Sequence, residues 1–377
     1  MNLLYMALQA GNRSGTGRYT EALLDALIER RDQADVTGLT ADALTVLWPR
    51  DFSRPRQVPG LQVLPRNPRG LARIFAEHWE VRRFRDHHDI VHYPASIGPI
   101  FHPGLPTVVT VHDLSFLRHP EWFRKNRAWY YHYWVARSVQ VADHLIADSQ
   151  ATADDLMNLL EVPANRISVA HLGVTPHFRP ATGDHIAVVR ETYNLPEHFF
   201  LYVGTLEPRK NIASLIRAWS QIAGEIPQDL VIAGRRGWKL HSVHRAWSKS
   251  SYRDRIHFPG YIPQEHLPAL LCAADAFTWP SLFEGFGLPP LEAMACGTPV
   301  LTANTSSLPE VVGDAALTVS PHDLHAMAQA LRRLSRDAGL REALRFAGHA
   351  RAAQFTWRNT AKTICEAYQY TMDNYGR

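Results

Sequence analysis

The sequence repeats one pattern from end to end: a short apolar run of strand length, then a segment whose apolar residues recur at helical spacing. The repeats fill both halves of the chain, which has 377 residues. Strands that alternate with helices predict parallel sheets covered by helices on both faces. This length exceeds one ordinary domain and suffices for two, each with its own buried core. We therefore expect an α/β protein made of two doubly wound domains.

A stretch without either periodicity separates the two halves. Residues 174–183 contain two prolines and end in glycine, which favours an extended connection over a helix or a strand. We expect one domain over residues 1–178 and the other over residues 184–356. The expected strands are 3–8, 90–92, 107–111, 144–147 and 167–171 in the first, and 199–204, 230–234, 256–258, 276–279 and 300–302 in the second. The expected helices include 151–160 with Ser149 as N-cap, about 322–353, and 357–373.

A glycine-rich segment follows the first expected strand and opens the first helix. It spans residues 11–17 and ends with Gly15 and Gly17. Backbone amides at such a position, together with the helix dipole, can bind an anion. The spacing differs from the G-x-G-x-x-G of dinucleotide-binding proteins, so a tight turn and a phosphate loop both stay open.

Two adjacent cations follow the first strand of the second half. Arg209 and Lys210 lie in a segment that begins at Gly204 and Thr205. At the carboxyl edge of a sheet, a forked guanidinium beside a compact ammonium suits a diphosphate. The alternative is a solvated basic loop.

The segment 281–297 has the most specific pattern in the chain. Its tandem prolines can begin a helix but cannot lie inside one, which predicts a loop that holds Glu284 and a short helix that holds Glu292. Glycines on both sides of Phe286 let a ligand approach the backbone amides there. Glu292 can then reach ribose hydroxyls, and Glu284 the hydroxyls of a sugar. A glycosidase pair of carboxylates is the alternative, which the proline break makes less natural.

A histidine and an aspartate end a strand of the first half. His112 and Asp113 follow the apolar run 107–111, so both belong at the carboxyl edge of the first sheet. This position is as compatible with a structural histidine as with a functional one. Asp113 is a candidate to orient His112 or to act as a base.

Charge and hydropathy exclude several classes of protein. The net charge is +4 and neither half is a basic arm, which gives nucleic-acid binding no support. No stretch approaches the roughly 18 consecutive apolar residues of a membrane-spanning helix. The first residues also lack the features of a signal peptide, so we expect a cytoplasmic protein.

An aromatic and basic segment, from Trp122 to Trp134, has two interpretations. It can form a surface that meets anionic lipid or a lipid-diphosphate-linked acceptor, peripheral to the inner face of the membrane. It can also be an ordinary helix that buries Trp122, Trp129 and Tyr133 in the first domain.

Together these residues resemble the retaining GT-B glycosyltransferases of family 4. The resemblance spans nearly the whole chain. It rests on residues 204–211, 260–262 and 295–300, on the seven residues between Glu284 and Glu292, and on residues 11–17 and 111–113. It implies two Rossmann-like domains that face each other across a cleft. It also implies that a C-terminal helix, about 357–377, packs back on the first domain.

The resemblance implies a role for each site residue. Arg209 and Lys210 would bind the donor diphosphate, and Glu284 would contact the transferred sugar. His112 would contact that sugar near the reacting centre, and Glu292 would bind the ribose. The other implied donor-binding residues are Gly15, Gly17, Gly204, Thr205, Gly260, Tyr261, Ile262, Gly285, Phe286, Gly287 and Leu288.

The implied reaction moves a hexose from a nucleotide-sugar donor to a glycan or lipid-linked acceptor with retention of configuration. Similarity to polysaccharide mannosyltransferases favours a GDP-mannose-type donor over a UDP-sugar. No D-x-D triplet occurs in the sequence, so we expect no metal and no other cofactor. Three alternatives stay open: an inverting enzyme with Asp113 as base, a sugar-nucleotide epimerase on the same fold, and an inactive nucleotide-sugar-binding subunit.

Overall fold

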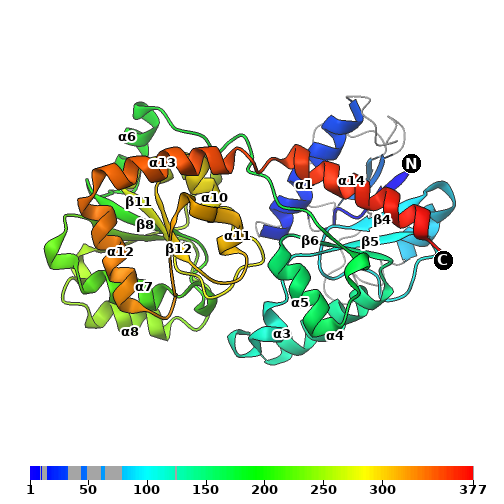
Figure 1. Ribbon diagram of the computed structural model, residues 1–377, viewed down its shortest axis with the longest axis horizontal. Coiled ribbons are helices and arrows are strands. Elements are labelled where there is room, and N and C mark those ends of the chain that lie inside the picture. Colours follow the sequence, from blue (N-terminus) through cyan, green and yellow to red (C-terminus); the bar gives the residue numbers. More distant parts are fainter. Residues whose placement is uncertain are drawn as a thin grey trace. The chain divides into compact units, whose positions relative to one another are not determined.

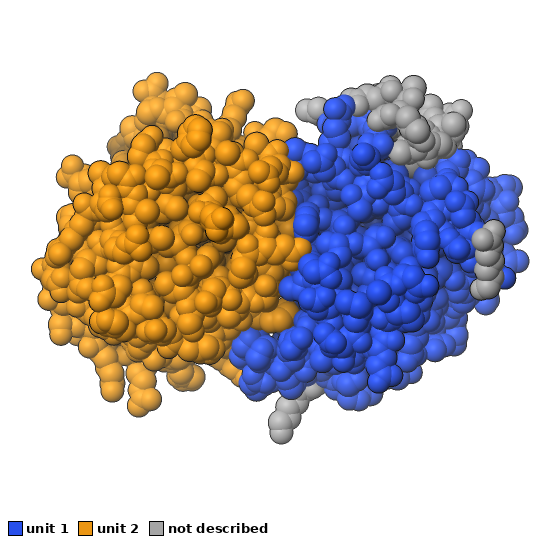
Figure 2. Space-filling view, viewed as in Figure 1, with its two compact units in different colours: residues 1–173, 356–377 blue, residues 174–355 orange. Residues whose placement is uncertain are grey.

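The chain folds into two compact units. The structure, a computed structural model, describes residues 1–8, 10, 15–32, 44–48, 61–63, 79–123 and 125–376. One unit comprises residues 1–173 and 356–377, and the other residues 174–355 (Figure 2). The chain therefore passes between the units twice.

The first unit is built on a parallel sheet of seven strands in the order β3-β2-β1-β4-β5-β6-β7. The strands are β1 (Leu3–Tyr5), β2 (Leu44–Trp48), β3 (Leu61–Val63), β4 (Ile90–Tyr93), β5 (Thr107–Val111), β6 (His144–Ala147) and β7 (Ile167–Val169). Strands β1, β4, β5 and β6 are buried along their whole length, as strands between two helix layers must be. The strand order reverses between β1 and β4, and in such folds ligands bind at the carboxyl ends of the strands near this point.

Helices from both ends of the chain cover this sheet. They are α1 (Gly15–Asp32), α3 (Ser115–Arg118), α4 (Lys125–Val141), α5 (Gln150–Leu160) and α14 (Trp357–Asn374). Helix α14 packs beside α1 (Figure 1), so the C-terminal segment belongs to the first unit. The hydroxyl of Ser149 accepts a hydrogen bond from the backbone N–H of Thr152 at 3.1 Å, which confirms the predicted N-cap of α5.

The second unit is built on a parallel sheet of six strands in the order β10-β9-β8-β11-β12-β13. The strands are β8 (Phe199–Val203), β9 (Asp229–Ala233), β10 (Ile256–Gly260), β11 (Ala276–Trp279), β12 (Val300–Ala303) and β13 (Leu317–Val319). The helices are α6 (Gly183–Thr192), α7 (Ile212–Ser220), α8 (His241–Lys249), α9 (Leu267–Ala273), α10 (Leu288–Ala295), α11 (Leu308–Val312), α12 (Leu324–Arg336) and α13 (Ala338–Ala352). The strand order reverses between β8 and β11.

The predicted pair of doubly wound parallel sheets is confirmed, with three strands that the sequence patterns missed. Strands β3 and β13 are sheet edges and β2 lies next to an edge. The side chains of β13 are only partly buried, so its apolar signal is weak. The single helix predicted over 322–353 is wrong, because Asp337 has an extended backbone between α12 and α13. Its carboxylate accepts a hydrogen bond from Leu340 N at 2.8 Å and caps α13.

The N-terminal segment of the first unit ends at Gly173, five residues before the expected domain limit at residue 178. The next residues are held by the second unit. Phe178 is buried, and the His177 ring bonds to the backbone oxygen of Gln264 at 2.9 Å. The extended segment therefore lies on the second unit and does not hang free as a linker.

The close approach of Gly173 to the start of α14 gives a test of the fold. A Cβ at residue 173 would lie 2.1 Å from the backbone nitrogen of Trp357. We expect Gly173→Ala to lower the free energy of unfolding of the first unit by about 1–3 kcal/mol, the usual cost of overpacking. Gly183→Ala is the matched control, since a Cβ there meets nothing within 4 Å. Urea unfolding measures both variants. Equal unfolding midpoints for wild type and Gly173→Ala would contradict the packing described for Gly173.

Candidate functional site

Two loops of the second unit meet where its strand order reverses. Arg209 and Lys210 lie in a helical turn, Pro208–Lys210, that follows β8. Glu284 lies in the loop that follows β11, the strand hydrogen-bonded to β8. Because both strands are parallel, their carboxyl ends share one edge of the sheet, and residues remote in sequence come into contact.

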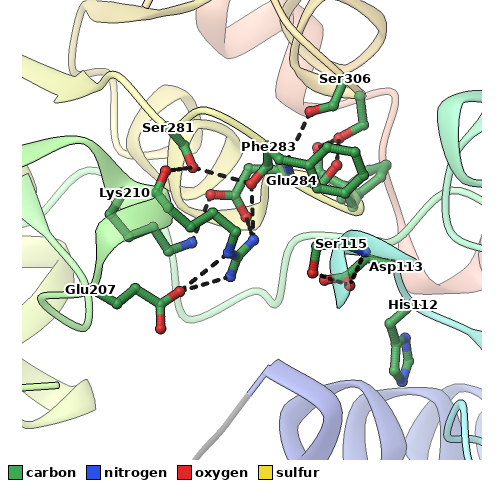
Figure 3. A network of polar contacts seen from close by, with 12 residues as sticks. His112, Asp113, Ser115, Glu207, Lys210, Ser281, Phe283, Glu284 and Ser306 are labelled. Carbon is green, nitrogen blue, oxygen red and sulfur yellow. Dashed lines mark hydrogen bonds and ion pairs between the residues drawn. The ribbon is translucent and has the colours of Figure 1, made fainter. Parts of the chain in front are cut away.

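The carboxylate of Glu284 is the centre of a buried charge cluster (Figure 3). Lys210 Nζ donates to Glu284 Oε1 at 2.6 Å, and Arg209 Nη1 donates to Oε2 at 2.9 Å. The indole N–H of Trp279 donates to Oε1 at 3.1 Å. The structure thus brings Arg209, Lys210 and Glu284 together. Lys210 is only 7% exposed, so the interpretation of its segment as a solvated basic loop is wrong.

A second carboxylate, which sequence reasoning missed, completes the cluster. Arg209 Nη2 lies 3.1 Å from Glu207 Oε1, and Arg209 Nη1 also donates to the backbone oxygen of Phe283 at 2.9 Å. Glu207 is buried. Its position two residues before Arg209 was the only signal in the sequence, and such spacing is common on surfaces too.

Burial and charge act in opposite directions on the pKa of Glu284. Burial raises the pKa of this carboxyl, but Arg209 and Lys210 outweigh burial and lower the pKa to about 2. The pKa of Lys210 is lowered by burial and by the neighbouring charge of Arg209, against the opposing effect of Glu284. Glu284 faces two cations, whereas Lys210 faces the cation Arg209 as well as the carboxylates Glu284 and Glu207.

Aromatic rings form the wall beside the cations. Lys210 Nζ lies 4.5 Å from the centroid of a Trp279 ring, within the range of a cation–π interaction. Trp279 stacks on Tyr202 with a centroid distance of 5.2 Å. Gly204 lies against both rings, since a Cβ there would approach Tyr202 Oη to 2.8 Å. The backbone oxygen of Thr205 accepts a hydrogen bond from the same hydroxyl at 3.3 Å.

Two serines fix the backbone of the Glu284 loop through hydrogen bonds. Ser306 Oγ accepts a hydrogen bond from Glu284 N at 2.8 Å. Ser307 Oγ lies 2.9 Å from the backbone oxygen of Glu284 and 2.6 Å from that of Phe286, and donates toward them. Sequence reasoning missed this pair, because nothing in the pattern after β12 distinguishes it from an ordinary turn.

Helix α10 begins directly after the glycine-rich loop. It starts at Leu288, and the tandem prolines lie in its first turn, as the sequence predicts for prolines that begin a helix. Gly287 precedes it with φ +117°, a conformation that favours glycine. Glu292 lies on the helix and is 7% exposed, so the prediction that the two glutamates occupy different elements is confirmed. Gly285 and Phe286 complete the loop between them.

Three of the predicted donor-binding residues, Gly260, Tyr261 and Ile262, lie at the end of the edge strand β10 and directly after it. Gly260 ends the strand with φ +82°. Tyr261 is 46% exposed, and the Arg235 guanidinium lies 4.5 Å from its ring centroid. Ile262 is buried. The run therefore presents one exposed aromatic ring beside a cation.

In the first unit, the structure places His112 next to an aspartate that sequence reasoning did not choose. Its Nδ1 lies 2.8 Å from Asp148 Oδ2, at the ends of the paired strands β5 and β6. Asp113 was a candidate to orient His112 or to act as a base, and the structure gives the hydrogen bond that orients the ring to Asp148. The Oδ1 of Asp113 instead accepts hydrogen bonds from the backbone N–H and the hydroxyl of Ser115, at 3.0 and 2.7 Å (Figure 3).

The glycine loop of the first unit is only partly described. Residues 11–14 lie outside the described residues. Gly15 is exposed and begins α1, whereas Gly17, two residues further on, is buried. Thr16 contributes its carbonyl to the hydroxyl of Thr20, at 2.8 Å.

The aromatic segment of the first unit does not bury the residues expected. Trp129 is 68% exposed and Tyr133 51% exposed, and the two rings stack at 5.8 Å on α4. The interpretation that buries them is wrong, because Val135 and Val139 form the buried side of this helix instead. Arg124 lies outside the described residues. Among the residues that are described, no helix combines the length and apolar character needed to cross a bilayer.

Comparisons with known proteins agree along the chain. Residues 13–178 match the family model described as "Glycosyltransferase Family 4", and residues 189–351 match "Glycosyl transferases group 1". The O-antigen chain mannosyltransferase B of Escherichia coli is 35% identical over 77% of this chain and 76% of its own length. A D-inositol 3-phosphate glycosyltransferase of Salinispora arenicola (strain CNS-205) is 31% identical over 79% of this chain and 72% of its own.

A solved structure gives the same fold. The Anabaena protein HepE, in complex with UDP, superposes with a TM-score of 0.74 at 20% identity, covering 97% of this chain and 99% of its own. At this identity the likeness shows the fold alone.

The low pKa of Glu284 predicts how the second unit responds to acid. The unfolded chain binds this proton more tightly than the folded one, so the ionised carboxylate adds stability above pH 4.5 that is lost as pH falls toward about 2. The linked free energy is about 3 kcal/mol. We expect the difference in unfolding free energy between wild type and Glu284→Gln to shrink over this range, measured by urea unfolding. Glu265→Gln, at an exposed glutamate of the same unit, should leave stability nearly unchanged throughout.

Proposed function

Because this chain belongs to the family 4 glycosyltransferases, it is a glycosyltransferase, and we propose that it transfers a hexose from a nucleotide-diphosphate donor to a hydroxyl of a glycan or lipid-linked acceptor. The observation that carries this proposal is the cluster of Arg209, Lys210 and Glu284 at the carboxyl ends of β8 and β11. Sites of doubly wound folds form at this position.

The cluster supplies what a departing diphosphate needs. Lys210 donates to Glu284, and Arg209 donates to Glu284 and to the backbone oxygen of Phe283 and pairs with Glu207, so each cation is held in place by a carboxylate. In a low-dielectric site, cations fixed in this way would stabilise the negative charge that develops on the leaving phosphate by turning toward it. Glu284 then fixes both cations and offers its carboxylate edge to hydroxyls of the transferred sugar.

The donor that we favour is GDP-mannose. The relative from Escherichia coli carries the name O-antigen chain mannosyltransferase B and aligns over most of this chain, which supports a mannosyl donor. The alternative is a UDP-sugar, because HepE was solved with UDP and with UDP-glucose. Glu292 would hold the ribose, and the exposed ring of Tyr261 would support the base.

We propose retention of configuration in the product. In the front-face route that the family resemblance implies, a phosphate oxygen of the leaving group takes the acceptor proton, and no protein base is needed. An inverting enzyme would need one, and Asp113 was the candidate. Two hydrogen bonds from Ser115 engage its Oδ1, which suits a turn-forming residue better than a base.

We propose that the reaction needs no divalent metal. The sequence holds no D-x-D triplet, and Arg209 and Lys210 lie at the site where we propose that the diphosphate binds. In the part of the chain that the structure describes, no group of three or more histidine, cysteine or acidic side chains is placed to hold a metal ion.

The test is transfer from a panel of GDP-, UDP- and ADP-sugars in the presence of EDTA. We expect acceptor-dependent release of GDP from GDP-mannose, unchanged by EDTA, and NMR of the product should show a retained anomeric configuration. Turnover of the donor without acceptor would indicate the epimerase. Binding without turnover would indicate the inactive subunit, and loss of activity in EDTA would contradict metal independence.

Removal of one buried cation tests the cluster directly. We expect Lys210→Met to weaken GDP binding about 10- to 100-fold, because a charge-assisted hydrogen bond contributes roughly 1.5–3 kcal/mol. Lys249→Met, at an exposed lysine of α8, is the matched control. Calorimetric titration with GDP measures both, and an unchanged dissociation constant for Lys210→Met would remove Lys210 from the site.

We also propose that the first unit touches the membrane from the cytoplasmic side through the Trp122 to Trp134 segment. The exposed stack of Trp129 and Tyr133 supports this, since such rings favour the lipid–water boundary. Paired substitution of Trp129 and Tyr133 by Ala should at least halve co-sedimentation with anionic vesicles. Equal pelleting of wild type and variant would contradict the membrane contact.

A further inference from the structure

A histidine and an aspartate form a tight pair in the first unit. His112 follows β5 and Asp148 follows β6, and the register of these strands pairs Val111 with Ala147, one residue before each. The two side chains therefore leave the sheet side by side. Their 2.8 Å contact joins His112 Nδ1 to Asp148 Oδ2.

The pair is buried on its aspartate side. Asp148 is 3% exposed, and its Oδ1 has no hydrogen-bond partner among the described residues. A buried carboxylate needs a compensating positive charge. The imidazole of His112 is the group that bonds to it, so the geometry favours the ionised pair.

The groups around His112 reinforce its charge. Burial lowers the pKa of His112. The charge and the hydrogen bond of Asp148 act in the opposite direction, together with smaller effects of Asp113 and of the carbonyl of Pro94. The net result is a raised pKa of His112. Burial raises the pKa of Asp148, against the opposing effects of His112 and, more weakly, His171.

Two buried titratable groups near the pair, His92 and Tyr19, stay neutral. Burial, with a smaller effect of His112, lowers the pKa of His92 to about 3. Burial, followed by the charge of Asp148, raises the pKa of Tyr19 well above its ordinary value. Neither group therefore competes with His112 for the proton near neutral pH.

A buried hydrogen-bonded chain fixes the ring that packs on His112. The Tyr19 ring meets the His112 ring edge-on at 4.8 Å, and its hydroxyl bonds to Thr110 Oγ1 at 3.0 Å. His92 bonds to the same threonine at 2.8 Å and to the hydroxyl of Tyr368 on α14 at 2.6 Å. His112 is thus held by Asp148 through one nitrogen and by Tyr19 across its ring.

The second ring nitrogen of His112, Nε2, is not used in the contact with Asp148. This nitrogen has no hydrogen-bond partner within 3.5 Å among the residues that the structure describes, and the carbonyl of Pro94 is the backbone group that acts on the ring. The backbone of His112 is anchored separately, since its N–H donates to Ser96 Oγ at 3.1 Å. An imidazolium in this arrangement donates one N–H to Asp148, and its second N–H can donate to a ligand.

We infer that Asp148 is a positioning residue for the transfer reaction, which holds His112 as an imidazolium so that its Nε2–H donates to an oxygen of a substrate bound at this edge of the first sheet. This inference rests on the proposed function. A neutral histidine oriented by an aspartate would instead present a lone pair at Nε2 and act as a base. The imidazolium has no such lone pair, so His112 contributes positive charge and a hydrogen bond, and it does not abstract a proton.

The test combines a titration with a pH profile. NMR of ¹⁵N-labelled histidine in the ligand-free protein, assigned with His112→Gln, should give a His112 midpoint above 6.5, its ordinary value. In Asp148→Asn the midpoint should fall by at least about one unit, which lowers the protonated fraction roughly tenfold at alkaline pH. We therefore expect kcat of this variant to approach wild type near pH 6 and to drop about tenfold by pH 8.

Asp275→Asn is the matched control, because Asp275 pairs with the half-exposed His198 at 3.2 Å in the second unit. It should leave the His112 midpoint and the pH profile unchanged. Equal thermal unfolding of the variants shows that Asp148→Asn folds, and the wild-type titration tests the charge of His112 without any variant.

Three results would overturn the inference. They are a wild-type His112 midpoint below 6.5, a midpoint that Asp148→Asn does not move, and a loss of kcat in Asp148→Asn that is the same at every pH. Failure of the proposed function is a separate result, because wild type would then transfer no hexose at any pH while the titration still reports the state of the pair.

Discussion

The second unit depends on one constraint: buried charges must be paired. Glu284 faces Arg209 and Lys210 at hydrogen-bonding distance, and Glu207 balances Arg209 from the other side. In a low-dielectric site the loss of one partner leaves the others unpaired at high cost. The loops after β8 and β11 are therefore fixed to each other by charge, and the aromatic wall and the serine contacts of the Glu284 loop keep that arrangement in place.

The same constraint applies in the first unit, where it involves one carboxylate and one imidazole. Asp148 is buried and His112 is the side chain that bonds to it, so the two hold each other in position. Here the buried imidazole of His92 is neutral, as its low pKa requires. Both units thus place a buried carboxylate at the carboxyl edge of a parallel sheet and use it to orient a cation. The oriented cation is the group that we propose meets an anionic or hydroxylated ligand.

Much of the candidate site was predictable because its signals are local. Prolines and glycines restrict the backbone wherever they occur, so residues 281–297 predicted a loop and a helix with one glutamate on each. The adjacent cations of residues 209 and 210 were equally visible. Trp129 and Tyr133 were misjudged because helical spacing indicates that one face is buried without showing which face.

The sequence by itself determined the class of fold, the division into two units, and most of the residues that carry charge at the site, since periodicity and turn chemistry act over a few residues. Only the tertiary structure decided the partners. Glu207, Asp148, Ser306 and Ser307 became recognisable when strand order and register brought their loops together. Asp113 is adjacent to His112 in sequence and Asp148 is not, yet parallel pairing of β5 with β6 gives Asp148 the contact. Such pairing depends on which strands are neighbours, a property of the whole sheet that no short stretch of residues encodes.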